Sequence, residues 1–463
     1  MNQIASVAPA WQGMGGAGAG LTRVLVAQAL AVRAEILSED AKTLARQCIL
    51  DYIACALPGA AEPLSAILLA ELAEQGGAEI ATVIGHAVRL PALSAALING
   101  AAAHALDFDD VNMAMPGHPS VAILPALLAL AEEIDADGNA LLAAFIAGYE
   151  LTCRIGLAVA PGHYNGLGFH ATGTLGSFGA AMACAHLMRL DEATSCAALG
   201  IAGTQAAGLK SMFGTMCKPF HAGTAAYHGL LSARLARRGF TSRDDVVECD
   251  QGFAATHSPD FHPEKALATP PGGLHLRNNL FKYHAACYLT HSPIEVARKL
   301  RSAHDLTPER IDRIRLRVDA ATSRVCNILA PRIGLEAKFS HRLTVAMALS
   351  GIDTGRLDAF SDANAADPAL SRLRDRVEID FQSGWSPTEA ELDLHLTDGQ
   401  TLTARHDAGI PAADIAEQGV RLEQKFIALA EPLLGSNRAR SVLGAVAGMD
   451  HAADVRGLMR LCT

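Results

Sequence analysis

The sequence has few aromatic residues and no run of basic residues. Aromatic side chains make up 5% of the 463 residues, and 38 Lys and Arg stand against 48 Asp and Glu, a formal net charge of −10. An acidic chain without a basic patch is a poor candidate for binding nucleic-acid phosphates. The composition therefore predicts no nucleic-acid partner.

The ten cysteines include no Cys-x-x-Cys pair. This absence argues against zinc ribbons, thiol redox motifs and iron–sulfur clusters. Several cysteines lie in apolar runs, where a reduced thiol packs as a small apolar side chain. We therefore expect a reducing compartment, the cytoplasm.

Long uncharged stretches are present, but they carry polar side chains. The stretch from Ile155 to Met188 contains His163, Asn165, His170 and many glycines. Such a segment would cross a lipid bilayer badly. The sequence therefore predicts no membrane partner.

Half of the residues are hydrophobic, Ala is abundant and Gly numbers 41, which indicates a folded protein of closely packed helices. Apolar residues at helical spacing continue to about residue 265. Two helices are expected within 21–56, on either side of a turn at 38–40, and the others lie at 65–73, 92–106, 120–134, 139–159, 174–188, 191–199, 222–237 and 242–249.

The pattern changes after the turn sequence at 269–273. Residues 311–318 alternate between apolar and charged, and 377–381 and 390–396 are also strand-like. An Asp-Gly turn at 398–399 joins the last of these to 401–405 as a hairpin, and helices are expected at 293–303 and 335–350. Helical spacing returns from about residue 420. The sequence thus predicts a mainly α protein: a flexible tail (1–20), a large helical domain from both chain ends (21–273 and 407–463), and an inserted α+β domain (274–406).

A dense group of His and Asp follows the small-residue run at 93–103. Its members are His104, Asp107, Asp109, Asp110 and His118. Carboxylates in an apolar setting must be paired or protonated. A solvated helix end and a site for one or two divalent ions are the alternatives to an acid–base site.

Two further groups could contact an anion. In 168–174, Thr172 or Thr174 could cap a helix whose backbone N–H groups and His170 face the ligand. Lys218, the single Lys or Arg between Lys210 and Arg234, precedes Pro219 and could pair with a substrate carboxylate. The alternatives to anion binding are structural: His170 would be a hydrogen-bonded histidine of the core, and Lys218 would bury its apolar stem at the start of a helix and keep its charge in solvent.

A fourth group stands near the start of the predicted insertion. His284, Cys287 and His291 share a helical face, which permits a metal site, although structural zinc normally needs a fourth ligand.

Taken together, these motifs resemble those of the MmgE/PrpD family. The matching motifs, in collinear order over about residues 22–460, are Asp51-Tyr52-Ile53 with Ala56, Asn99-Gly100, 104–110, His118-Pro119-Ser120, 168–174, Lys218-Pro219-Phe220-His221 with Gly223, Lys282-Tyr283 with Cys287 and His291, and Lys338-Phe339-Ser340. Members include 2-methylcitrate dehydratase, cis-aconitate decarboxylase and iminodisuccinate epimerase. The resemblance implies a helical domain, a smaller α+β lid domain, a homodimer, and neither an organic cofactor nor an iron–sulfur cluster.

The resemblance also implies a site and a reaction: cofactor-independent proton transfer next to a carboxylate of a small di- or tricarboxylate, by a lyase. The implied catalytic residues are His118, Asp107, Lys218, His170 and Tyr164, with His118 oriented by Asp107 as the acid–base group; candidate substrate contacts are His104, Thr172, Lys282, Tyr283 and Cys287. No metal is expected.

Three departures bear on the substrate. Val111 stands where decarboxylase-like relatives carry threonine, Cys287 stands where the decarboxylase has histidine, and the segment from Asp107 to His118 is one residue longer than in the animal decarboxylase. The segment is closer to that of the epimerase, so an epimerase remains an alternative, as does a metal-dependent hydrolase or lyase.

Overall fold

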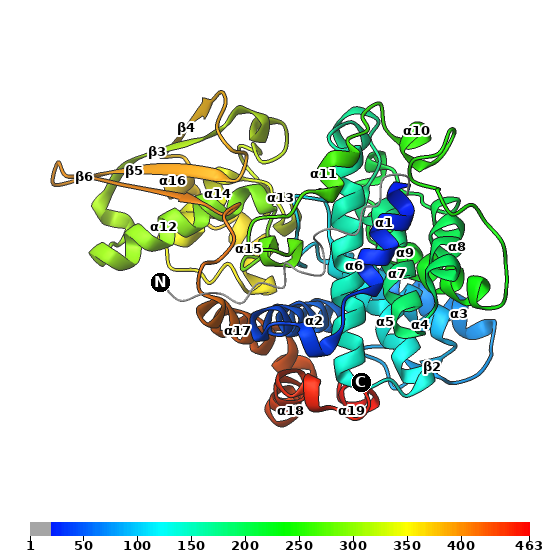
Figure 1. The fold of residues 1–463 in the computed structure, drawn as a ribbon. Coiled ribbons are helices and arrows are strands. Elements are labelled where there is room, and N and C mark those ends of the chain that lie inside the picture. Colours follow the sequence, from blue (N-terminus) through cyan, green and yellow to red (C-terminus); the bar gives the residue numbers. More distant parts are fainter. Residues whose placement is uncertain (1–19) are drawn as a thin grey trace. The chain divides into compact units, whose positions relative to one another are not determined.

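The computed structural model describes residues 20–463, which are mainly helical (Figure 1). The predicted tail, 1–20, lies outside the described residues except for Gly20. The described chain divides into two compact units, one ending at Phe281 and resuming at Ala413, the other spanning Lys282–Ala412. The sequence placed these junctions a few residues earlier, after 273 and after 406.

The first unit is built from helices and one short hairpin, β1 with β2. Its elements are α1 (Leu21–Leu30), α2 (Glu39–Gly59), α3 (Pro63–Glu74), β1 (Ala81–Thr82), β2 (Arg89–Leu90), α4 (Ala92–Ala105), α5 (Pro119–Ile134), α6 (Gly138–Val159), α7 (Ala171–Leu187), α8 (Glu192–Gly203), α9 (Cys217–Arg237), α10 (Phe253–His257), α11 (Pro263–Leu267), α17 (Ile415–Leu434), α18 (Ser436–Ala447) and α19 (Arg456–Leu461). The prediction of a mainly α protein is confirmed.

The helix predicted at 242–249 is wrong, because this segment forms bends and turns. Its polar groups bind α1 instead: Val247 N donates to Thr22 Oγ1 at 3.1 Å, and the Glu248 carboxylate accepts a hydrogen bond from Thr22 N. A helix over 242–249 would instead have paired Val247 N with the carbonyl oxygen four residues earlier.

Small residues allow the central helices to approach closely. A Cβ at Gly223 of α9 would lie 2.2 Å from the carbonyl oxygen of Leu97 in α4, and one at Gly148 of α6 would lie 2.4 Å from that of Gly179 in α7. At Gly229, α9 meets α7 in the same way. The high Gly and Ala content is therefore needed where these helices cross.

Helix α6 is long and apolar enough to cross a membrane by length and composition, but 94% of its apolar window is buried inside the structure. Helices α2 and α3 satisfy the same test only as a pair bent by 86°. Burial of this extent is typical of a core helix.

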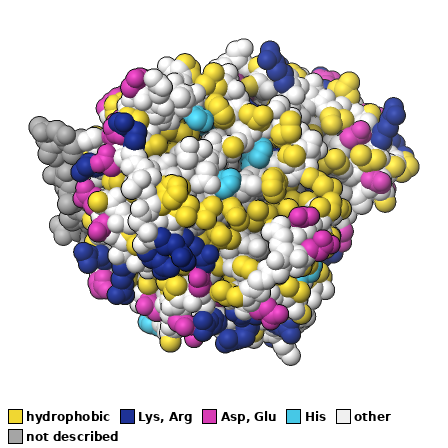
Figure 2. Space-filling view, turned by 90° about the vertical axis from the view of Figure 1, so that its right-hand side faces the viewer, with side chains coloured by type: hydrophobic (Ala, Val, Ile, Leu, Met, Phe, Trp, Pro, Cys, Tyr) yellow, Lys and Arg dark blue, Asp and Glu magenta, His cyan; other side chains and the backbone are white. Residues whose placement is uncertain are grey.

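The face on the side of α3 and α8 carries many apolar side chains around a few histidines, and charged side chains gather toward its edges (Figure 2). Ile67 of α3, for example, is 59% exposed. Apolar faces are typical of contacts between protein chains. The homodimer that the family resemblance implies stays a prediction.

The second unit is an α+β fold. Its elements are α12 (His291–His304), β3 (Ile311–Asp319), α13 (Gly334–Ala337), α14 (His341–Leu349), α15 (Asp362–Ala365), α16 (Pro368–Arg374), β4 (Val377–Gln382), β5 (Glu389–Leu396) and β6 (Thr401–Asp407). The sheet order is β4-β3-β5-β6, with β3 and β4 parallel and the other pairs antiparallel. The single helix expected at 335–350 is interrupted, since Ser340 caps α14 by accepting from Leu343 N.

The alternation seen in the sequence of β3 sets the two faces of this sheet. Ile314, Leu316 and Val318 enter a core that α12 and α14 complete. On the other face, Arg317 pairs with Asp393 at 2.8 Å and with Glu391. The side-chain period of two therefore separates an apolar face from a ladder of ion pairs.

One buried carboxyl in α6 makes a test of pH dependence possible. Glu150 is fully buried and its Oε1 accepts a hydrogen bond from Leu276 N at 2.9 Å. Burial raises the pKa of Glu150 to about 7, although nearby Arg154 favours the charged form. Glu150 therefore takes up a proton in the folded state at a pH where an unfolded chain has lost it.

Replacing Glu150 by Gln should make the protein less sensitive to alkaline pH. A carboxyl with a raised pKa stabilises the fold most below its unfolded value and loses this contribution as pH rises through about 7. The free energies of unfolding of E150Q and of the unmodified protein can be measured by urea denaturation at several pH values. The difference, E150Q minus unmodified, should increase by about 1–3 kcal/mol from pH 5 to pH 8. A difference that is constant with pH would contradict this prediction.

Candidate active site

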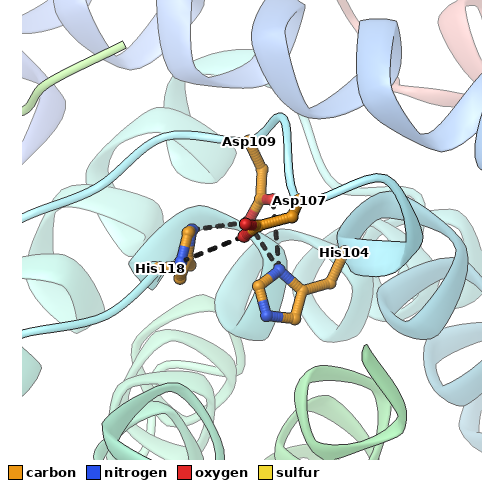
Figure 3. Close-up of side chains that lie close together, drawn as sticks. All are labelled: His104, Asp107, Asp109 and His118. Carbon is orange, nitrogen blue, oxygen red and sulfur yellow. Dashed lines mark hydrogen bonds and ion pairs between the residues drawn. The ribbon is translucent and has the colours of Figure 1, made fainter. Parts of the chain in front are cut away.

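The site is built on the loop that joins α4 to α5. His104 lies in the last turn of α4, and Asp107, just after its end, adopts a left-handed conformation with φ of 52°. Such a conformation is tolerated by Asp and redirects the chain sharply. The loop then returns so that His118 directly precedes α5. Four side chains of this segment meet (Figure 3).

Asp109 stands between two imidazoles. Its Oδ2 lies 2.9 Å from His104 Nδ1 and 3.0 Å from His118 Nδ1. Burial favours the protonated acid, but the two imidazoles outweigh it and hold the pKa of Asp109 well below its ordinary value. Burial lowers the pKa of His104 to about 4, so this imidazole is neutral at pH 7 and donates its Nδ1 proton to Asp109. Asp109 is therefore an anion enclosed by histidines.

Asp107 occupies the open side of the cluster. Its Oδ1 lies 2.6 Å from Lys218 Nζ and 3.8 Å from His118 Nε2. The side chains differ in solvent exposure. His104 and Asp109 are 0% and 1% exposed, whereas His118, Lys218 and Asp107 are 12%, 15% and 40% exposed. A small molecule can therefore reach the Lys218–Asp107 side and not the His104–Asp109 side.

A second pair of histidines adjoins the cluster. The ring of His170 stacks on His104 at 5.7 Å, and His170 Nδ1 lies 3.0 Å from His221 Nδ1. Burial, then the positive charges nearby, lower the pKa of His170 well below its ordinary value. Phe213 meets His170 edge-on at 4.9 Å and lies 5.6 Å below Lys218 Nζ. This side of the site is thus lined by neutral rings.

Three helices begin at these residues. His118 precedes α5 and His170 precedes α7, and neither side chain caps its helix. Lys218 is the second residue of α9, whose first N–H is satisfied by Thr215 Oγ1. The positive ends of the helix dipoles and the ammonium group together favour a negatively charged ligand.

The loop is held in place by contacts to its neighbours. His118 N donates to Thr172 Oγ1 at 3.1 Å, so Thr172 anchors the loop and does not cap α7. Asp110 accepts hydrogen bonds from Ser120 Oγ at 2.5 Å and from Asn279 Nδ2 at 2.9 Å. Burial raises the pKa of Asp110 to about 7. Asp110 is therefore a loop anchor.

The structure brings together His104, Asp107, His118, His170, Thr172 and Lys218 from the predicted set. Tyr164 lies in a π-helical turn at 162–166 and contacts Lys210, whose Nζ stands 3.7 Å from the centre of its ring. Thr174 is not a cap either: its Oγ1 bonds His163 Nε2 at 2.7 Å. The roles of Lys282, Tyr283 and Cys287, which belong to the second unit, stay predictions.

A single group of close metal-ligand atoms occurs among residues 20–463. His104, Asp107, Asp109 and His118 each offer one atom within 4.8 Å of the others. Asp110 is outside this group. The alternative set of His284, Cys287 and His291 does not form such a group in the described chain; His284 instead bonds Glu295 at 3.2 Å and Thr354 at 2.8 Å.

Sequence reasoning missed three features of the site. It assigned the orienting carboxylate to Asp107, whereas Asp109 is the carboxylate next to His118 Nδ1. His221 and Phe213 were not singled out as site residues, although His221 belongs to the motif that begins at Lys218 and Phe213 lies five residues before Lys218. Their proximity to Lys218 was the available signal.

Comparison with known proteins agrees with the residue pattern. A family model for the MmgE/PrpD N-terminal domain matches residues 23–266, and one for the MmgE/PrpD C-terminal domain matches residues 284–450. The chain belongs to the MmgE/PrpD family.

Several relatives in this MmgE/PrpD family are named cis-aconitate decarboxylase. The human protein (Homo sapiens) is 30% identical over 395 residues, covering 81% of this chain and 80% of the relative. The Aspergillus terreus protein is 27% identical and covers 91% of both chains, and the mouse protein (Mus musculus) is 29% identical, covering 81% and 79%. Family membership and these relatives support an enzyme of the lyase class.

The two carboxylates of the cluster should differ in what they contribute to stability. Asp109→Asn leaves buried imidazoles without their anion and should lower the free energy of unfolding by about 1–3 kcal/mol. Asp107→Asn removes a charge that is 40% exposed and should cost less than about 1 kcal/mol. Urea denaturation of both variants at pH 7 checks the order, and equal losses would contradict it.

Proposed function

We propose that this MmgE/PrpD protein is a cofactor-independent lyase that moves a proton at a carbon next to a carboxylate of a small di- or tricarboxylate. Its similarity to proteins named cis-aconitate decarboxylase makes cis-aconitate the first substrate to test, and the dehydration of 2-methylcitrate the second. The observation that carries the proposal is the meeting of His118, Lys218 and the starts of α5 and α7 around one partly open carboxylate.

In this proposal a substrate carboxylate takes the place of Asp107 as the partner of Lys218. Lys218 is 15% exposed and Asp107 is 40% exposed, so the ion pair is accessible to a competing anion. The ends of α5 and α7 and the ammonium group then stabilise the charge that develops on the substrate. Fixed donors and charges of this kind act most strongly where water is excluded.

His118 is the proposed acid–base group, and Asp109 orients it through Nδ1 while Nε2 faces the open side near Asp107. In decarboxylation, the C–C bond to the departing CO2 leaves its electron pair on the substrate, and protonated His118 donates a proton to that carbon. In dehydration, neutral His118 removes the proton and the hydroxyl leaves as water with a proton from a second acid. A positioned acid–base group contributes typically about 10²–10⁴-fold.

The metal-ligand group favours a second candidate function. A divalent ion held by His104, Asp107, Asp109 and His118 would make the protein a metal-dependent lyase or hydrolase. The Lys218–Asp107 ion pair of 2.6 Å opposes this candidate, because a cation already occupies one of the four groups.

Replacing His118 by Ala should abolish turnover while the fold is retained. A substrate panel of cis-aconitate, 2-methylcitrate, citrate and iminodisuccinate, followed by proton NMR, gives the readout. The matched control is His228→Ala, on the same helix as Lys218 and about 15 Å further along its axis. We expect kcat of H118A to fall at least about 100-fold and that of H228A to stay near the unmodified value. Turnover retained in H118A would reject the assignment.

Solvent deuterium and chelation separate the alternatives. In D2O, a decarboxylase should release CO2 and form a product with about one deuterium, and a dehydratase should release water and form an alkene. Inversion of the substrate with deuterium exchange and no alkene would mean an epimerase. Activity should survive exhaustive EDTA treatment, because the proposed acid–base group is an imidazole. Loss of activity that added Zn²⁺ or Mg²⁺ restores would favour the metal-dependent candidate.

A further inference from the structure

A buried lysine from near the end of the chain reaches the site loop. Lys425 lies in α17 and its side chain is 4% exposed. Its Nζ donates to the carbonyl oxygen of Phe108 at 2.6 Å and to Asp51 Oδ1 at 2.6 Å, and it stands 4.0 Å from the centre of the Phe108 ring. Helices α2 and α17, which are far apart in the sequence, thus both contribute to holding the Phe108 carbonyl in the loop between α4 and α5.

Asp51 belongs to a family-like motif that the proposed reaction does not use directly. It lies in the middle of α2 and its side chain is 1% exposed. Burial lowers the pKa of Lys425, but the Asp51 carboxylate offsets this, and the charge of Asp109 acts in the same direction, so the pKa lies above its ordinary value. Lys425 is therefore a buried cation whose field reaches Asp109.

The free-energy cost of desolvating a buried ion pair is about as large as the attraction between its charges. The Lys425–Asp51 pair is therefore not explained by a gain in stability. A buried pair does restrict the conformation of whatever it bonds. Here that is the carbonyl of Phe108, whose own side chain is 0% exposed. The peptide bond that this carbonyl belongs to leads directly into Asp109.

Phe108 lies in the chain between the two carboxylates of the cluster, Asp107 and Asp109. Asp107 on one side pairs with Lys218, and Asp109 on the other pairs with His104 and His118. Fixing the Phe108 carbonyl therefore sets both carboxylates relative to the three helix starts. A displacement of about 1 Å at a catalytic group can cost about 100-fold in rate.

We propose that Lys425, held by Asp51, is a positioning residue of the site: it anchors the Phe108 carbonyl and thereby keeps Asp109 against His118. Its effect on turnover rests on the proposed function, whereas its effect on the loop does not. The segment after the second unit thus contributes to the site through α17.

The test variant is Asp51→Asn with Lys425→Met, which removes both charges, keeps the side-chain volumes similar and leaves the net charge unchanged. The matched control is Arg46→Met with Asp450→Asn. That pair also joins α2 to the C-terminal segment, with Arg46 NH1 2.8 Å from Asp450 Oδ1 and side chains 17% and 13% exposed. The control therefore reports any general loosening between these segments.

The first readout is hydrogen–deuterium exchange of the peptide covering 107–118, which needs no substrate. In D51N/K425M the loop amides should exchange at least about tenfold faster than in the control, because the Phe108 carbonyl loses a charged hydrogen bond. Loop exchange equal to that of the control would overturn the proposal. This result stands even if the unmodified protein turns over no polycarboxylate, an outcome that would reject only the proposed function.

The second readout is steady-state kinetics. We expect kcat of D51N/K425M to fall about tenfold or more with KM changed less than about twofold, because Lys218 and His170 lie on other helices. An unchanged kcat would overturn the positioning role. If the double variant does not fold, Lys425→Gln alone replaces it: the shorter, uncharged side chain no longer gives the Phe108 carbonyl a charged hydrogen bond, so loop exchange should rise about threefold, and no rise would overturn the proposal.

Discussion

Close approach of helix backbones is the constraint on which the site depends. Where α4 meets α9, Gly100 and Gly223 face each other so closely that a Cβ at Gly100 would lie 2.9 Å from Gly223 Cα. Helices α5, α7 and α9 pack against one another in the same bundle. The starts of the three helices consequently lie close enough for His118, His170 and Lys218 to share one cluster. Larger side chains at these crossings would separate them.

The second constraint is the cost of burying charge. The pKa of Asp109 stays well below its ordinary value inside the protein because two imidazoles face it, and the buried Asp51 carboxylate is paired with Lys425. Asp110 has no cation of this kind among its hydrogen-bond partners, and its pKa rises to about 7. Two neighbouring carboxyls of one loop, Asp109 and Asp110, thus have pKa values shifted in opposite directions by their surroundings, which is the usual way to divide roles between chemically identical groups.

One of the departures from decarboxylase-like relatives, Val111, falls on a residue whose backbone contact is defined. Val111 pairs through its backbone with Leu280, and its side chain offers no hydroxyl where such relatives carry threonine. A missing or added hydrogen-bonding group changes discrimination between substrates far more than a methylene does. Under the proposed function, this position would bear on which polycarboxylate is accepted, and the proposed acid–base cluster on the reaction that follows.

Local pattern was enough to predict much of the fold. The alternation at 311–318 and the Asp-Gly turn at 398–399 identify β3 and the β5–β6 hairpin, because strands and turns are encoded by neighbouring residues. The pattern failed at 242–249, where contacts with Thr22 replace a helix, and at 338–340, where Ser340 starts a new one. Both errors arise where side chains distant in sequence, or a single cap, outweigh local propensity.

For the site, the residue types could be predicted without the fold: an imidazole-rich, carboxylate-rich loop, a lone lysine at a helix start, and glycines that permit close packing. Tertiary structure decided the pairings. That Asp109 faces His118, that Asp107 faces Lys218, and that Lys425 reaches Phe108 across 317 residues depend on how helices cross. Ion pairs form between groups a few ångströms apart in space, and the separation of two residues in the sequence does not predict that distance.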